Sequence, residues 1–92
     1  MIVRVLEEGQ YEVAEEVLES LNEFDDEVVA AVEAGDETRF ARGLAELVGR
    51  IQASGTKLPD DYLGPSDFVV PSAGASLEEV REMLSEEGLI PG

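Results

Sequence analysis

The sequence of 92 residues contains no cysteine, no histidine and no tryptophan. Without cysteine, the chain can form neither a disulfide framework nor a thiolate metal site. Without histidine or cysteine, it lacks the usual imidazole general base and the nucleophile–histidine pairs of many hydrolases. These absences weigh against an enzyme, and we expect no cofactor.

Basic residues are also scarce, since 6 Lys and Arg stand against 22 Asp and Glu, which gives a formal net charge of −16. A protein that binds nucleic-acid phosphates should be basic, so nucleic acid is disfavoured as a partner. Anionic lipid is disfavoured for the same electrostatic reason. Because the excess charge opposes compaction unless salt screens it, we predict a halophilic source. An acidic protein from a mesophile is the alternative.

Long hydrophobic runs are missing as well. No apolar run approaches the ~18 residues of a transmembrane helix. The apolar stretch 1–6 is too short for a signal peptide and carries Arg4. We therefore expect a cytoplasmic protein without direct membrane insertion. With 43% apolar residues, the chain can build one small core, which predicts a single domain over 1–92.

Two segments are predicted to form a small, mainly antiparallel sheet. Residues 1–13 have the β-branched strand, turn glycine and alternating second strand of a β-hairpin. In the first strand, Arg4 shares a face with Ile2 and Leu6, so we expect that face to be partly open. A short strand at 67–71 should pair with the hairpin, because an isolated two-stranded hairpin is marginal in water.

Three helices are predicted from apolar residues spaced by three or four. They cover 14–34, 36–54 and 76–87, and the last begins with a capping box at Ser76 and Glu79. Weak helix formers at 22–26 leave open whether 14–34 is one helix or two. Because Gly35 and Asp36 leave almost no loop, the two long helices should form an antiparallel hairpin. The predicted class is α+β, with the sheet packed on the helical hairpin and the C-terminal helix.

The second long helix differs from the rest of the chain in charge. Residues 1–34 have a net charge of −10 and residues 58–92 one of −7, whereas residues 35–57 have one of +1. Arg42, Glu46 and Arg50 are spaced by four and could pair along one face. This face is either solvated or a docking strip for an acidic partner helix. The candidate partner-binding residues are Arg39, Arg42, Arg50 and Tyr62, the last as the aromatic expected to be exposed in a loop.

A cation site is a weaker candidate. Asp60, Asp61 and Asp67 lie in a Pro- and Gly-rich loop and could gather around a hard cation. Their spacing does not match an EF-hand loop. Turn and capping roles explain these carboxylates more simply, and we expect no metal there.

Several segments resemble the PspA-associated proteins (PspAA), a family of small proteins of archaea and actinobacteria. The most specific match is the pair of closing stretches 75–81 and 84–92. The opening stretches 1–6 and 8–11 also match, and further matches are 21–22, 25–26, LPDD at 58–61 and PSD at 65–67. The resemblance covers essentially the whole chain in the same order. One departure is Glu7, where small residues are usual in the hairpin turn.

The resemblance implies a companion of PspA, a phage-shock protein from a coiled-coil superfamily that assembles on stressed membranes. It implies no chemistry that these residues would perform. We therefore predict a non-catalytic interaction module, an adaptor or regulator of PspA that reaches the membrane periphery through this partner. Because the predicted sheet is too small to cover both helical stripes, apolar helix surface should also remain for a partner or a homodimer. The alternatives are a stand-alone homodimer and a cation-binding acidic domain.

Overall fold

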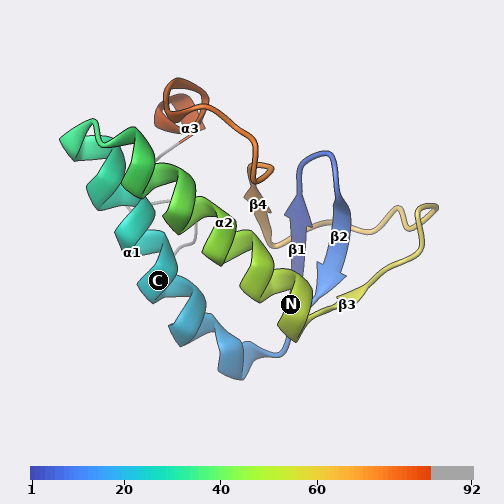
Figure 1. Cartoon of the computed structure of the whole chain (residues 1–92). Coiled ribbons are helices and arrows are strands. Elements are labelled where there is room, and N and C mark those ends of the chain that lie inside the picture. Colours follow the sequence, from blue (N-terminus) through green and yellow to red (C-terminus); the bar gives the residue numbers. More distant parts are fainter. Residues whose placement is uncertain (84–92) are drawn as a thin grey trace.

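A four-stranded sheet and a layer of two long helices form the molecule, which a computed structural model describes over residues 1–83 (Figure 1). The two long helices run antiparallel side by side and lie over one face of the sheet, and a third, shorter helix lies beyond one end of the pair. The loop that joins the third and fourth strands extends away from the helices. The predicted α+β class is confirmed.

The sheet has the strand order β3-β2-β1-β4. The hairpin strands β1 (Ile2–Val5) and β2 (Gly9–Glu12) pair antiparallel, as predicted. The predicted strand at 67–71 is β4 (Phe68–Val70), which pairs parallel with β1. The remaining strand, β3 (Thr56–Lys57), pairs antiparallel with β2 and was not predicted, because two residues are too few to show an alternating pattern.

The hairpin turn places a glutamate in a conformation that favours glycine. The Glu8 N–H donates to the Val5 carbonyl at 3.0 Å, and Glu7 has a φ of 71°. A positive φ at the third position of a turn is typical of type II, where glycine is preferred. Glu7 is exposed, so its side chain adds no steric conflict with the core. The positive φ therefore favours glycine at this position, and Glu7 adopts it at a cost in backbone strain.

The first predicted helix is one continuous helix. A 3₁₀ turn, η1 (Glu15–Val17), leads directly into α1 (Leu18–Ala34), so the alternative of two shorter helices is wrong. Asn22 and the Asp25–Asp26 pair lie within the helix despite their weak propensity. Packing explains this, because Leu21 and Val28 on either side are fully buried.

Two consecutive residues end α1 and begin α2 (Glu37–Ser54). Gly35 adopts a left-handed φ of 69°, and its N–H donates to the Val32 carbonyl at 3.1 Å. The Asp36 N–H donates to the Ala31 carbonyl at 3.0 Å, and its carboxylate accepts the Arg39 N–H at 3.0 Å. The short connection confirms the antiparallel helical hairpin predicted from Gly35 and Asp36.

The third helix, α3 (Leu77–Met83), contacts the C-terminal end of α1 through a side-chain hydrogen bond. Ser76 Oγ accepts the Glu79 N–H at 3.2 Å, as the capping box predicts. The Arg81 guanidinium donates to the Val32 carbonyl at 3.2 Å, which places a cation at the C-terminal end of α1. Val80 is fully buried. Residues 84–87 of the predicted helix lie outside the described residues.

The core lies between the sheet and the helices, and it covers the stripe of α2 completely. The inward side chains of α2 are at most 4% exposed: Phe40, Leu44, Leu47, Val48 and Ile51. The expectation of uncovered apolar surface on this helix is therefore wrong. The stripe of α1 is less completely covered, because Leu18 and Phe24 pack against the core but are only partly buried. Among the described residues, the exposed large hydrophobic side chains are instead Leu6, Leu63 and Val69, which lie on the sheet and its loop.

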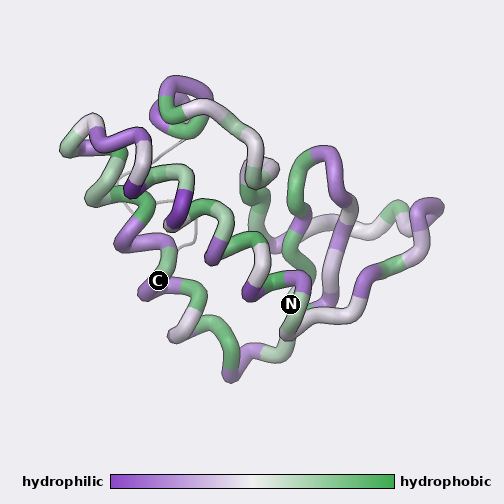
Figure 2. The backbone as a smooth tube through the Cα atoms, in the orientation of Figure 1, coloured by the Kyte–Doolittle hydropathy of each residue, from purple (hydrophilic) through white to green (hydrophobic). Residues whose placement is uncertain are grey.

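A buried glutamine ties the β3–β4 loop to the sheet. Gln10 Nε2 donates to the Tyr62 carbonyl at 3.3 Å, and Ser66 Oγ donates to Gln10 Oε1 at 2.7 Å. Gln10 lies opposite Arg4 in the hairpin, and Arg4 lies opposite the exposed Val69. The face that carries Arg4 is thus partly open, as predicted, and the loop covers only its Gln10 side. Figure 2 shows hydrophilic stretches at the hairpin turn and near the end of this loop.

Candidate functional site

A shallow groove of about 520 Å³ lies between α1 and α2. Its lining residues come from the middle of α1 and the first half of α2: Glu23, Phe24, Glu27, Arg39, Arg42, Gly43 and Glu46. Two of the predicted partner-binding residues, Arg39 and Arg42, are therefore brought together at one site. The groove was not predicted, because it depends on how closely the two helices approach.

A glycine and an aromatic ring give the groove its shape. Gly43 is buried where α2 meets α1, and a Cβ atom added to it would lie 3.4 Å from Val28 Cγ2. The missing side chain lets the helices pack closely at this point. Phe24 packs partly against the core, but its ring is not fully buried and also lines the groove. The groove therefore combines an apolar element with charged walls.

The two arginines of the groove differ in their partners. Arg39 Nη2 lies 3.1 Å from Glu27 Oε2, which joins α2 to α1 across the groove. Arg42 is exposed and has no acidic partner within 4 Å among the described residues. Because both members of the Arg39–Glu27 pair are about half exposed to solvent, the pair adds only about 0–1 kcal/mol of stability. Arg42 is thus available to a carboxylate from outside.

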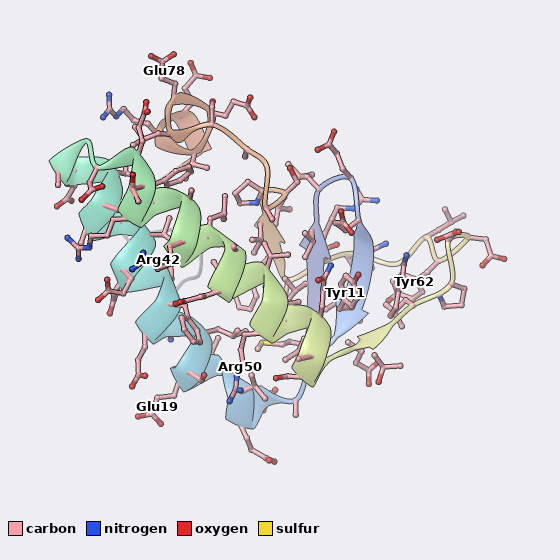
Figure 3. All side chains as sticks on the ribbon, in the orientation of Figure 1. Tyr11, Glu19, Arg42, Arg50, Tyr62 and Glu78 are labelled. Atoms are coloured by element: carbon pink, nitrogen blue, oxygen red, sulfur yellow. The ribbon has the colours of Figure 1, made fainter. Side chains whose placement is uncertain are left out.

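Arg50 lies on the same helix but outside the groove. Figure 3 shows Arg42 and Arg50 on α2, with Arg50 nearer the end of the helix that leads into β3. Arg50 is exposed, and the expected pairing of Glu46 with Arg42 and Arg50 is not formed within 4 Å. The arginines of α2 therefore line one exposed side of the helix, and two of them have no acidic partner in the described part of the chain.

Tyr62 lies in the β3–β4 loop, away from these arginines (Figure 3). Its ring lies directly over Gly64, and the residue is only partly exposed. The adjacent Leu63 is 96% exposed and is the more accessible apolar side chain of this loop. Sequence reasoning missed Leu63, because a single leucine in a loop without periodicity does not indicate whether its side chain is buried or exposed. Tyr62 and the arginines do not form one surface.

The three aspartates of the β3–β4 loop are not gathered into a cation site. Asp67 Oδ2 accepts the Ile2 N–H at 2.7 Å, so this carboxylate holds the start of β1 against the residue that precedes β4. Asp60 and Asp61 are exposed and are the two central residues of a turn in which the Tyr62 N–H donates to the Pro59 carbonyl at 3.0 Å. Within residues 1–83, no group of three or more carboxylates could hold a metal ion.

Comparison with protein families identifies the chain. The model of the PspA-associated protein family, PspAA, matches residues 1–92. The chain belongs to the PspA-associated protein family. The expectation drawn from the motifs at 58–61, 65–67 and 75–81 is thus confirmed. The name of the PspA-associated family refers to a partner, and this family is not known as an enzyme family.

Further comparisons add no relative to the PspA-associated family match. The searches of curated proteins and of solved structures returned no match. Among the described residues, no helix has both the length and the hydropathy needed to cross a membrane.

Proposed function

We propose that this protein is a non-catalytic interaction module that binds PspA and acts as its adaptor or regulator. The observation that carries the proposal is the match of the PspA-associated family to the whole chain. Because the model of a family named for its association with PspA matches the whole chain, we expect the folded domain, rather than a short attached motif, to bind PspA.

The surface that we propose for PspA is the side of α2 that carries Arg39, Arg42 and Arg50. In a chain with a net charge of −16, this is the long element on which bases outnumber acids. An approaching acidic segment meets less repulsion there than over α1, whose side chains include six acids and no base. Exposed arginines are also frequent anchors in protein interfaces.

The same charge distribution supports a location in the cytoplasm with indirect access to the membrane. An anionic lipid surface would repel a body with sixteen excess negative charges. Recruitment to the membrane periphery through PspA avoids this repulsion. The absence of histidine and cysteine from the sequence supports a role without catalysis.

Binding to purified PspA from the same organism tests the proposal. We expect a complex in near-native salt, measured by co-purification and by calorimetry. The double variant Arg42→Glu, Arg50→Glu should weaken binding by about tenfold or more, because two contacts become repulsive. The matched control is Arg4→Glu, Lys57→Glu, which makes the same change in net charge on the exposed strands and should bind like the parent protein.

The outcomes test separately whether the protein binds PspA and whether α2 is the docking surface. If the parent protein forms no complex with PspA, the proposed function is wrong. If both double variants lose affinity equally, the effect comes from net charge and α2 is not the docking surface. Sedimentation of the isolated protein tests the homodimer alternative, since a monomer at all concentrations excludes a stand-alone dimer.

A further inference from the structure

The outward side of α2 has small side chains where an acidic protein would normally carry charges. Positions spaced by four, three, four and four residues form this ridge, and all are exposed: Thr38, Arg42, Ala45, Gly49 and Ala53. Apart from Arg42, each has a small uncharged side chain. The wider exposed surface of α2 carries only Glu37 and Glu46 as acids.

The two long helices expose different charges to solvent. The exposed residues of α1 include five acids: Glu19, Glu23, Asp26, Glu27 and Glu33. Both helices bury a stripe in the same core, so both need an outward side that water can solvate. On α1 the exposed charges are carboxylates, whereas α2 has a ridge of mainly small residues that includes Arg42 and is bordered by Arg39 and Arg50.

We infer that the element of PspA that binds here is an α-helix with acidic side chains, which lies along the outward ridge of α2. This inference rests on the proposed function and adds the kind of partner element and its placement. A spacing of three and four residues is the periodicity that one helix presents to another. Small side chains let two helix backbones approach closely, and the ridge continues straight over most of an element about 27 Å long.

The charges define which helix fits. Arg42 and Arg50 have no acidic partner within 4 Å in the part of the chain that the structure describes. They are eight residues apart, which is about 12 Å along the axis. Carboxylates seven or eight residues apart on the partner helix would therefore meet both. The groove beside Arg42, with Phe24 in its wall, can receive an apolar side chain of the same helix.

Salt determines how strongly the negative charge of the protein repels an acidic partner helix. In ~1 M salt the screening length is about 3 Å, so the overall charge of −16 no longer repels an acidic helix at a distance. Direct contacts between arginine and carboxylate are weakened less, because the two groups touch at about 3 Å and leave no room for salt ions between them. The position of the arginines, rather than the net charge, therefore selects the ridge.

The absence of cysteine from the chain allows a direct footprint of the bound partner. Single variants Ala45→Cys and Gly49→Cys place a thiol on the ridge. Ala34→Cys and Ala73→Cys place it at exposed positions on α1 and in the loop before α3. The rate of maleimide labelling of each variant is measured by mass spectrometry, with and without purified PspA at about ten times its dissociation constant.

We expect labelling at positions 45 and 49 to slow by about tenfold, in proportion to the fraction bound, and labelling at 34 and 73 to stay unchanged. If a complex forms but positions 45 and 49 react at the free rate, this inference is wrong and the proposed function stands. If no complex forms, both fall. Protection at 45 and 49 without PspA, rising with the concentration of the protein itself, would assign the ridge to a second copy and overturn the inference.

Discussion

The two long helices perform the same packing task with different outward chemistry. α1 has 17 residues and α2 has 18, and the two run antiparallel with their apolar stripes in one core. Their sequences differ sharply in charge: α1 carries six acids and no base, whereas α2 carries two acids and three arginines. Packing constrains the inward sides alone. The residues on the outward sides therefore indicate what each helix contacts outside the domain.

The ends of the two helices also differ. α2 begins with its own cap, the Asp36 carboxylate, and α1 begins without a side-chain cap after a 3₁₀ turn. At its C-terminal end, α1 receives a hydrogen bond from Arg81 of α3. The acidic helix thus depends on a basic residue from a distant part of the chain, because it has no base of its own for its negative end.

Removal of one core leucine from each helix tests whether the inward sides are equivalent. Leu21→Ala in α1 and Leu44→Ala in α2 should each lower the free energy of unfolding by about 2–5 kcal/mol, because both side chains are fully buried. Denaturant unfolding in 2 M KCl measures the change. The same substitution at Leu63, which is 96% exposed, is the control and should have almost no effect. A cost below about 1 kcal/mol at either helix would show that the inward side of that helix contributes less to the core than the inward side of the other.

The stabilisation of the fold by salt should come mainly from α1, the acidic helix. Raising KCl from 0.1 to 2 M should raise Tm by about 10 °C, or roughly 2 kcal/mol, because it screens the repulsion among sixteen excess charges. The exposed α1 pair Glu19→Gln, Glu23→Gln should reduce this gain. The α2 pair Glu37→Gln, Glu46→Gln should not reduce it, since these two glutamates share α2 with three arginines whose positive charges offset the repulsion.

Thermal melts monitored by circular dichroism give these values. An unchanged Tm between 0.1 and 2 M KCl would contradict the prediction of adaptation to salt. Equal losses of the salt-induced gain in both double variants would show that the total charge matters and the helix does not.

Substitutions at the helix ends should change the free energy of unfolding least. Asp36→Ala removes the acceptor of the Arg39 N–H and should cost about 1 kcal/mol, whereas Asp36→Ser keeps an acceptor and most of the stability. Arg81→Ala should cost a similar amount by freeing the end of α1, and Arg81→Lys should recover part of it through its charge. Unfolding free energies test both. If Asp36→Ser is as destabilising as Asp36→Ala, the cap is not what begins α2.

Sequence reasoning predicted those elements that depend on near neighbours. The apolar spacing in 36–54 matches the buried residues of α2, and Gly35 ends α1 in a left-handed conformation. Ser76 caps α3 through a residue three positions away. The two-residue strand β3 and the parallel pairing of β4 with β1 were not predictable, since their partners lie more than 40 residues away in the chain.

For the candidate site, the sequence identified the arginines of α2 but not their setting. The groove requires the close approach of Gly43 and Val28, and the ion pair requires Glu27 and Arg39 to face each other across two helices. Sequence spacing suggested pairing of Glu46 with Arg42 and Arg50, which the structure does not form. The burial of Gln10 beneath the loop and the exposure of Leu63 likewise depend on a loop path that has no local signal.

The acidic character, the α+β composition and the family follow from the sequence, because charge, periodicity and motif are properties of residues in order along the chain. Which apolar stripe is covered, which arginines lack an acidic partner within residues 1–83 and where a groove opens follow only from the folded chain. Burial and ion pairing depend on distances between residues far apart in the chain. Only the folded packing of helix on helix and helix on sheet sets those distances.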